Sequence, residues 1–203
     1  MTVSALSAGP LRLKSVESSG GYPTSARGRE GLMRAHSGSA GGCPKRRARD
    51  AILTRREAAR RVRLARRRGE RVVFTSGCFD LLHVGHLRSL EEARSLGDRL
   101  LVAVNRDATV RRLKGADRPI LREAQRAEML AGLACVDWVT FFAEATPRAL
   151  LGQVMPDIYA KGGDWSLREL CARDLPVGAP IEVHRLRQIP GVRTTSLVEK
   201  IRR

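Results

Sequence analysis

Two histidines separated by two residues are the part of this sequence whose residue types and spacing point most directly to chemistry. His83 and His86, in the string His83-Val84-Gly85-His86, would share one face of a helix. Gly85 carries no side chain, so a ligand can approach the backbone there. A helix that begins here would offer unpaired N–H groups and a partial positive charge, which together bind phosphate well. The pair therefore suits a reaction whose transition state gathers negative charge on phosphoryl oxygens.

The residues around this pair are expected to form a strand, a tight loop and a helix. Residues 72–74 are a short apolar run typical of a buried parallel strand, and the small residues 75–77 end it. Apolar residues then recur at helical spacing, at Leu87, Leu90, Ala93 and Leu96. Strand, loop and helix make the opening half of a βαβ unit. Two histidines in that position favour a catalytic interpretation over the alternative of a helix cap or a surface histidine.

Strands and helices are predicted to alternate along the rest of the chain. Further buried strands are expected at residues 100–104, 136–142, 156–160 and 181–186. Helices are expected at residues 51–69, 123–133, 148–154 and 196–201. Capping-box spacing places the start of the first helix near Thr54 and that of the last at Ser196, and Pro147 would open the third at its first position. The alternation predicts an α/β fold with a five-stranded parallel sheet and helices on both faces.

The string GCFDLLHVGH, residues 77–86, resembles the signature of the HxGH nucleotidyltransferases, the cytidylyl- and adenylyltransferases with a Rossmann-like fold. RRLKG at residues 111–115 and KGGDW at 161–165 are similar to further segments of that family, and the resemblance runs from about residue 50 to residue 203. It implies a Rossmann-like fold and transfer of AMP from ATP to a sugar 1-phosphate, with release of pyrophosphate. The motifs are similar to those of members that act on D-glycero-β-D-manno-heptose 1-phosphate and make ADP-heptose.

The resemblance also implies roles for individual residues. His83, His86 and Lys114 are expected to be catalytic. The nucleotide is expected to contact Gly77, Cys78, Phe79, Asp80, Gly85, Arg126, Lys161, Gly162, Gly163, Asp164, Trp165, Thr194 and Thr195. Mg²⁺ is expected to arrive with ATP, with no metal site built from the protein alone. Arg126 and Lys114 would hold the β- and γ-phosphates, while Asp164 and Trp165 would lie at the ribose and the base.

The acceptor site is expected to be less like the family pattern than the nucleotide site. Asn105 and Asp107 follow the second strand at the sheet edge where open α/β sheets place their ligands, and they are candidate substrate-binding residues together with Arg193. Arg193 stands where the family shows a serine, and Ser76 stands where similar members carry an asparagine. Ala179-Pro180 replaces a glycine pair. We therefore expect any difference from the family in sugar-phosphate specificity rather than in nucleotide chemistry.

Charge and cysteine content limit the other functions that the chain could have. The net charge is +17, but residues 1–70 carry +12 of it and residues 71–203 only +5, so the globular part is mildly basic and nucleic acid is not an expected partner. Cys43, Cys78, Cys135 and Cys171 form no CxxC pair, which argues against structural zinc or a disulfide framework and favours a reducing cytoplasm. No apolar run is long enough to span a bilayer, and no secretory signal is evident.

We expect a disordered tail rich in Gly, Ser and Arg at residues 1–49, followed by a nucleotidyltransferase domain at residues 50–203. Within that domain, residues 50–69 would form an N-terminal helix and residues 72–203 the Rossmann-like core. Family members are often fused to a sugar kinase, and nothing of kinase size is present here, so a separate kinase is expected to supply the sugar 1-phosphate. Dimers are common in the family, and a homodimer is compatible with the resemblance.

Three alternatives remain open at the level of the sequence. One is a cytidylyltransferase acting on a polyol or amino-alcohol phosphate, such as glycerol 3-phosphate. Another is a fragment of a class I aminoacyl-tRNA synthetase, although no KMSKS-like segment is present. The last is a non-enzymatic nucleotide-fold module whose basic arm binds RNA, which would show salt-dependent affinity for RNA.

Overall fold

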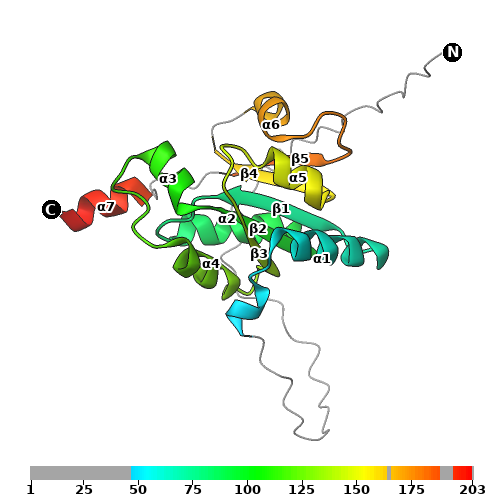
Figure 1. Ribbon diagram of the computed structural model, residues 1–203, viewed down its shortest axis with the longest axis horizontal. Helices are drawn as coiled ribbons and strands as arrows, with labels where there is room; N and C mark the ends of the chain where they lie inside the picture. Colours follow the sequence, from blue (N-terminus) through cyan, green and yellow to red (C-terminus); the bar gives the residue numbers. More distant parts are fainter. Residues whose placement is uncertain (1–46, 164–165, 188–193, 203) are drawn as a thin grey trace, which may run out of the picture.

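The computed structural model describes residues 47–163, 166–187 and 194–202 (Figure 1). Most of the expected tail, and the expected site residues Asp164, Trp165 and Arg193, lie outside the described residues. The elements in chain order are η1 (Ala48–Ala51), α1 (Arg55–Arg67), β1 (Val72–Gly77), α2 (Val84–Ser95), β2 (Arg99–Asn105), α3 (Asp107–Lys114), α4 (Glu123–Ala131), β3 (Trp138–Phe142), α5 (Arg148–Val154), β4 (Ile158–Gly162), α6 (Leu167–Asp174), β5 (Glu182–Leu186) and α7 (Thr194–Arg202).

The five strands form one parallel sheet in the order β3-β2-β1-β4-β5. This confirms the predicted Rossmann-like α/β fold. The chain moves outward from β1 through β2 to β3, and then returns to the other side of β1 with β4 and β5. The strand order therefore reverses between β1 and β4. In open α/β sheets, the crevice outside the carboxyl ends of the strands at such a point is where ligands bind.

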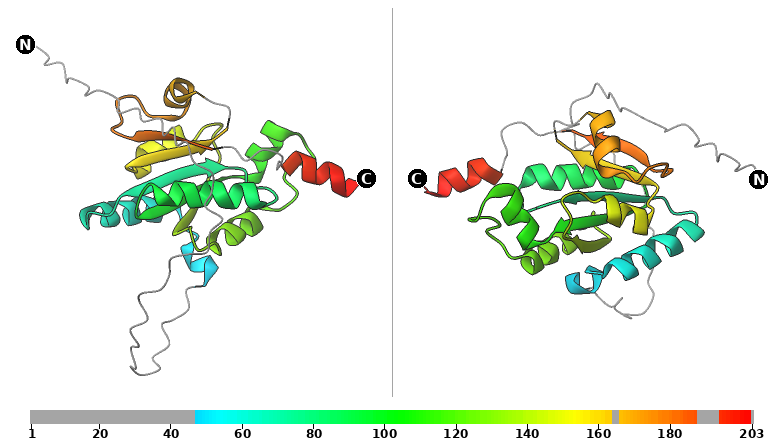
Figure 2. Two further views of the ribbon diagram at one scale, coloured as in Figure 1. Left: turned by 180° about the vertical axis from the view of Figure 1, so that it is seen from behind. Right: turned by 45° about the horizontal axis from the view of Figure 1, so that its top comes forward.

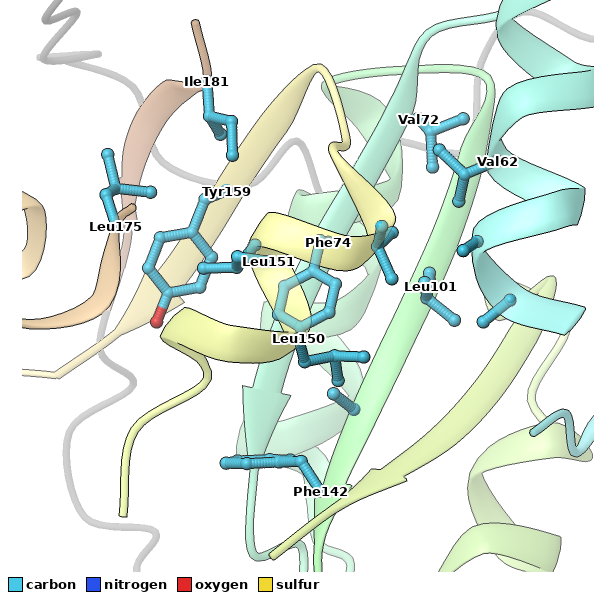
Figure 3. Packing of buried hydrophobic residues seen from close by; sticks show 14 of the residues in the cluster. Val62, Val72, Phe74, Leu101, Phe142, Leu150, Leu151, Tyr159, Leu175 and Ile181 are labelled. Carbon is cyan, nitrogen blue, oxygen red and sulfur yellow. The ribbon is translucent and has the colours of Figure 1, made fainter. Parts of the chain in front are cut away.

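Helices cover both faces of the sheet and enclose two apolar cores (Figure 2). On one face, α1, α5 and α6 pack on Val72, Phe74 and the other residues of the cluster drawn in Figure 3. On the opposite face, α2 and α4 pack on a cluster that contains Val73. Residues 100–104 of β2 are all 0% exposed, because a central parallel strand is buried on both faces. The continuous apolar runs of the sequence follow from this arrangement.

Local sequence signals account for the ends of α1. The side-chain hydroxyl of Thr54 accepts a hydrogen bond from the backbone N–H of Glu57, and the Glu57 carboxylate accepts from the N–H of Thr54 at 2.8 Å. This reciprocal capping box satisfies N–H groups that the first helical turn leaves unpaired. Gly69 follows the helix with φ +78°, a left-handed conformation that glycine adopts without strain. The predicted start near Thr54 and end at Gly69 are confirmed.

Several predicted boundaries were wrong. β1 and β4 continue to Gly77 and Gly162, because ladder pairing with β2 and β5 extends through the glycines expected in loops. Pro147 is the N-cap of α5 rather than its first residue, and α7 begins at Thr194, two residues before the expected cap. The short helices α3 and α6 were not predicted at all. The signal for α6 was present, because Ser166 and Glu169 form a capping box.

The N-terminal part of the described chain packs on the domain. Arg49, inside the segment expected to be a tail, pairs with Glu128 of α4 at 2.9 Å. Across the ranges that the structure describes, we find no helix with both the length and the apolar character needed to cross a membrane.

Candidate active site

A pocket of about 420 Å³ lies at the carboxyl ends of β1 and β4, where the strand order reverses. Its walls come from the ends of three strands, the loop after β1, the first turns of α2, the end of α3 and the start of α7. Figure 1 shows α3 and α7 together at one end of the molecule. The sequence-predicted residues that line this pocket are Gly77, Cys78, Phe79, Asp80, His83, Gly85, His86, Lys114, Lys161, Gly162, Gly163 and Thr194. Residues far apart in the sequence thus meet in one place.

The two histidines lie against each other at the start of α2. His83 is the N-cap of this helix, and its Nδ1 accepts a hydrogen bond from the backbone N–H of His86 at 3.3 Å. The two imidazole rings are stacked, with centroids 3.8 Å apart and planes inclined by 21°. Because Nδ1 of His83 is an acceptor, a neutral His83 carries its proton on Nε2. That N–H is the one that His83 can offer to a ligand.

Burial keeps both rings neutral at physiological pH. Burial lowers the pKa of His83. For His86, burial together with the neighbouring His83 and Lys114 lowers the pKa from 6.5 to about 4. The Nδ1 atom of His86 is buried and has no hydrogen-bond partner among the described residues. A buried polar atom without a partner is uncommon and costs about 1–3 kcal/mol, so its presence in a pocket wall is typical of a site that binds a polar ligand.

Phe79 packs against His86, and Gly77 packs against Phe79. The Phe79 ring meets the His86 ring edge-on, with centroids 5.4 Å apart, and Phe79 itself has a positive φ of 46°. A Cβ atom added at Gly77 would lie 3.0 Å from the Phe79 ring, which is too close for an undisturbed contact. Gly77 is therefore needed for the packing that supports His86.

Asp80 lines the pocket, but its carboxylate is already occupied. It is 1% exposed and accepts hydrogen bonds from Nε of Arg118 at 2.6 Å and from the backbone N–H groups of Ile120 and Leu121 at 2.8 and 3.1 Å. These contacts fix the loop after Lys114 against the loop after β1. The Asp80 carboxylate is therefore engaged within the protein, and the expected contact with the nucleotide would involve only the small part of Asp80 that lines the pocket.

Arg126 does not lie where the resemblance implied. It is 0% exposed, and its guanidinium donates to the carbonyl oxygens of Leu121 at 3.0 Å, Asn105 at 2.8 Å and Cys78, and to the carboxylate of Asp107 at 2.7 Å. An arginine with these partners cannot also reach the β- and γ-phosphates. Asn105 and Asp107, expected to bind the acceptor, are partners of this guanidinium instead, and none of the three residues lines the pocket.

Sequence reasoning missed several lining residues: Thr75, Ser76, Ser89, Leu90, Leu186 and Arg187. Ser89 could have been found, because it follows His86 by three residues and shares its helical face. Leu186 and Arg187 could have been found from the rule that places ligands at the carboxyl ends of the strands. Thr195 lies in the first turn of α7, and its side chain is outside the described part of the structure.

The described residues offer little to a metal ion on their own. We find among them no group of three or more His, Cys, Asp or Glu side chains placed to hold one. Asp80 is the only carboxylate among the described residues that line the pocket, and it is bound to Arg118. A divalent ion in this pocket would therefore depend on phosphate oxygens of the substrate for most of its ligands.

Fold and site together define a Rossmann-like α/β domain of the nucleotidyltransferase type. Comparison with protein families then gives the membership directly: the chain belongs to the cytidylyltransferase-like family, whose model matches residues 74–194.

Similar proteins agree with this membership. The bifunctional protein HldE of Alkalilimnicola ehrlichii is 49% identical over 150 residues, covering 74% of this chain and 31% of the relative. The HldE of Azotobacter vinelandii is 51% identical over 139 residues, covering 68% and 29%. The chain thus spans about 30% of the length of the curated relatives it matches. A crystal structure of the lipopolysaccharide core biosynthesis protein from Thermoplasma volcanium aligns with a TM-score of 0.54 and 31% identity, covering 60% of this chain and 99% of that one.

Proposed function

We propose that this chain transfers AMP from ATP to a sugar 1-phosphate, foremost D-glycero-β-D-manno-heptose 1-phosphate, to give ADP-heptose and pyrophosphate. The observation that carries the proposal is the stacked, neutral histidine pair at the first turn of α2, inside the pocket where the strand order reverses. Support for the sugar comes from the motifs in residues 77–86 and 161–165. A relative named for lipopolysaccharide core biosynthesis supports the same choice.

In this mechanism the α-phosphate of ATP lies over the start of α2. The Nε2–H of His83 and the ring of His86 donate hydrogen bonds to its oxygens as the phosphorus becomes pentacoordinate, and the N-terminal end of the helix adds partial positive charge. Gly85 allows the phosphate to come close to the backbone. Because burial lowers the pKa of both histidines, each ring enters the reaction neutral, with a single N–H to donate.

The transfer itself is a single in-line displacement. A phosphate oxygen of the acceptor attacks the α-phosphorus and forms the new P–O bond, while the bond to the oxygen of the β-phosphate breaks and pyrophosphate leaves with the electron pair. The attacking oxygen is already ionised at neutral pH, so the mechanism needs no strong general base. The work of the protein is positioning and charge stabilisation.

Lys114 at the end of α3 is placed to neutralise the departing pyrophosphate, because its charge is felt at His86 and it lines the same pocket. Thr194 and Thr195 at the start of α7 would add polar contacts to the phosphates. Mg²⁺ bound to the triphosphate would supply further neutralisation of the leaving group. Gly162 and Gly163 leave room for the nucleoside beside β4, and Asp164 and Trp165 would hold its ribose and base.

A cytidylyltransferase is the second candidate, because the family model that matches the chain is cytidylyltransferase-like. Both reactions release pyrophosphate from the same pocket geometry, so the nucleotide has to be determined by assay. We propose a cytoplasmic location, where nucleoside triphosphates are available, and a sugar kinase as the source of the 1-phosphate.

The test is a pyrophosphate-release assay with ATP and CTP across heptose, hexose and polyol phosphates. We expect turnover with ATP and heptose 1-phosphate well above all other pairs. Turnover with CTP and glycerol 3-phosphate would favour the second candidate. No pyrophosphate from any pair would refute a nucleotidyltransferase function.

A further inference from the structure

Two lysines line the pocket, and their surroundings differ. Lys114 ends α3 and helps to lower the pKa of His86, so it lies beside the histidine pair. Lys161 lies on β4, and its ammonium is held by Ser76 of β1. The two lysines thus reach the pocket from different elements, and Arg187 after β5 is a third cation in its lining.

We propose that Lys161, held in place by Ser76, binds the phosphate group of the acceptor, so that the pocket has a second phosphate subsite apart from that of the triphosphate. This inference rests on the proposed function, because it assumes that two phosphate-bearing substrates meet in the pocket. It moves Lys161 from the nucleotide, where the resemblance placed it, to the acceptor.

The ammonium of Lys161 is fixed by contacts with β1. Its Nζ donates to the carbonyl oxygen of Ser76 at 2.8 Å and to the Ser76 hydroxyl at 2.9 Å. An ammonium has three N–H donors, and the third has no acceptor among the described residues. Because Lys161 lines the pocket, that donor is available to a ligand there. Burial lowers the pKa of Lys161 to about 8, so the group is still mostly charged at pH 7.

The carboxylate that acts on Lys161 is that of Asp174, and it is bound by other side chains rather than by Lys161. The Tyr159 hydroxyl donates to Asp174 at 2.7 Å, and Ser76 acts on the pKa of the same phenol. Figure 3 shows the Tyr159 ring within the core and its hydroxyl at the margin. Asp174 is 0% exposed and also accepts from Nε of Arg173 at 2.9 Å. Among the described residues, no carboxylate pairs directly with Lys161, so its charge remains available to an anion in the pocket.

The geometry of the reaction assigns the two lysines to different phosphates. In an in-line displacement the attacking oxygen and the leaving pyrophosphate lie on opposite sides of the α-phosphorus. Both groups are anions, and bringing them to one phosphorus requires a cation on each side. Lys114 stands with the histidines on the side where we place the pyrophosphate. Lys161, held on β4 by its contacts with Ser76, is then the cation for the attacking phosphate.

The test compares two single variants, each lacking one of the two lysines, and each variant is the control for the other. Binding of mannose 1-phosphate, unphosphorylated mannose and α,β-methylene-ATP with Mg²⁺ is measured by calorimetry for wild type, Lys161→Met and Lys114→Met. We expect Lys161→Met to lower the affinity for mannose 1-phosphate about 10- to 100-fold, as for loss of a hydrogen bond to a charged group. The affinity for the ATP analogue should fall less than about threefold. Lys114→Met should show the reverse pattern. Lys161→Arg, which keeps the charge, should restore part of the affinity for mannose 1-phosphate.

Two results would overturn the inference. One is a Lys161→Met protein whose affinity for the ATP analogue falls as strongly as its affinity for the sugar phosphate. The other is wild-type protein, loaded with the analogue, that binds neither mannose 1-phosphate nor inorganic phosphate in a Lys161-dependent way.

A measurement on wild-type protein tests the same inference without any variant, so it does not depend on a variant that folds. The pKa of Lys161, followed by the ¹³C signal of its Cε, should rise when inorganic phosphate or mannose 1-phosphate binds and should stay near its starting value with the ATP analogue. A lysine with a purely structural role would not respond, and that outcome would refute the subsite. If pyrophosphate release fails while this response persists, only the proposed function falls.

Discussion

His83 accepts a hydrogen bond at Nδ1 from the backbone of His86, and this contact decides which ring nitrogen faces a ligand. The neighbouring ring stacks on it at 3.8 Å, and Phe79 supports that ring from its edge. Two stacked imidazoles could not both be protonated without strong repulsion. At the residue scale, the site is therefore a pair of fixed, neutral hydrogen-bond donors placed at a helix N-terminus.

The low pKa of His86 predicts how stability depends on pH. Its pKa is about 4 in the folded protein and near 6.5 when the chain unfolds, so between these values the unfolded state binds more protons. The contribution of this group to stability is complete above about pH 6.5 and is lost as the pH falls toward about 4. We expect His86→Gln to show a smaller drop in Tm between these pH values than wild type does, measured by calorimetry. Equal drops in the two proteins would contradict the low pKa.

Gly77→Ala tests the packing beneath the histidines. The added Cβ would lie 3.0 Å from the Phe79 ring, so Phe79 and with it His86 must shift. The ring must give by a few tenths of an ångström, and misplacement of a reacting group by about 1 Å can cost 10²-fold in rate, so we expect kcat for pyrophosphate release to fall about 2- to 10-fold. Gly152→Ala in α5 is the control, since its Cβ would make an ordinary 3.5 Å contact with Pro176. It should leave kcat unchanged and stabilise the protein by about 0.5–1 kcal/mol.

At the scale of elements, Arg126 is the link that holds the pocket wall together. Its guanidinium bonds the loop after β1, the end of β2, the start of α3 and the residue two positions before α4. Asp80 makes a second link, from the loop after β1 to the loop that follows Lys114. These buried contacts fix the relative position of the segments that carry the histidines and Lys114.

Arg126→Lys should therefore destabilise the protein in the absence of any nucleotide. A lysine cannot reproduce the planar set of donors that the guanidinium offers to four acceptors, and Asp107 would lose its partner. We expect a loss of about 3 kcal/mol in unfolding free energy by urea titration. Arg111→Lys on the surface of α3, matched in chemistry, should change stability by less than about 0.5 kcal/mol. A ligand-free Arg126→Lys protein as stable as wild type would restore the phosphate-binding role for this arginine.

At the scale of the whole molecule, the parallel sheet was predictable because its strands are buried on both faces. Residues 72–74 and 100–104 are nearly continuous apolar runs for that reason, and the histidine string sits where the strand order reverses. The role of Arg126 was not predictable, because three of its four partners lie 19 to 48 residues away and only the fold brings them close. The start of the short helix α3 was missed because the N–H of Asp107 is capped by Glu123, 16 residues away, rather than by a local side chain.

The chain also separates its charge by region. Residues 1–70 carry most of the net charge, whereas the cations that line the pocket are few and include Lys114 and Lys161. Catalysis in this account therefore depends on placed groups rather than on overall basicity. Raising ionic strength should weaken nonspecific association with polyanions more than it weakens turnover.

The most direct measurement is kcat for AMP transfer by His86→Ala, with ATP-analogue affinity and thermal unfolding recorded on the same protein. We expect kcat to fall about 10²–10³-fold, on the scale of losing one donor to a developing oxyanion, in a protein that remains folded. A folded His86→Ala enzyme that retains kcat within about threefold of wild type, well under the effect of such a donor, would contradict it.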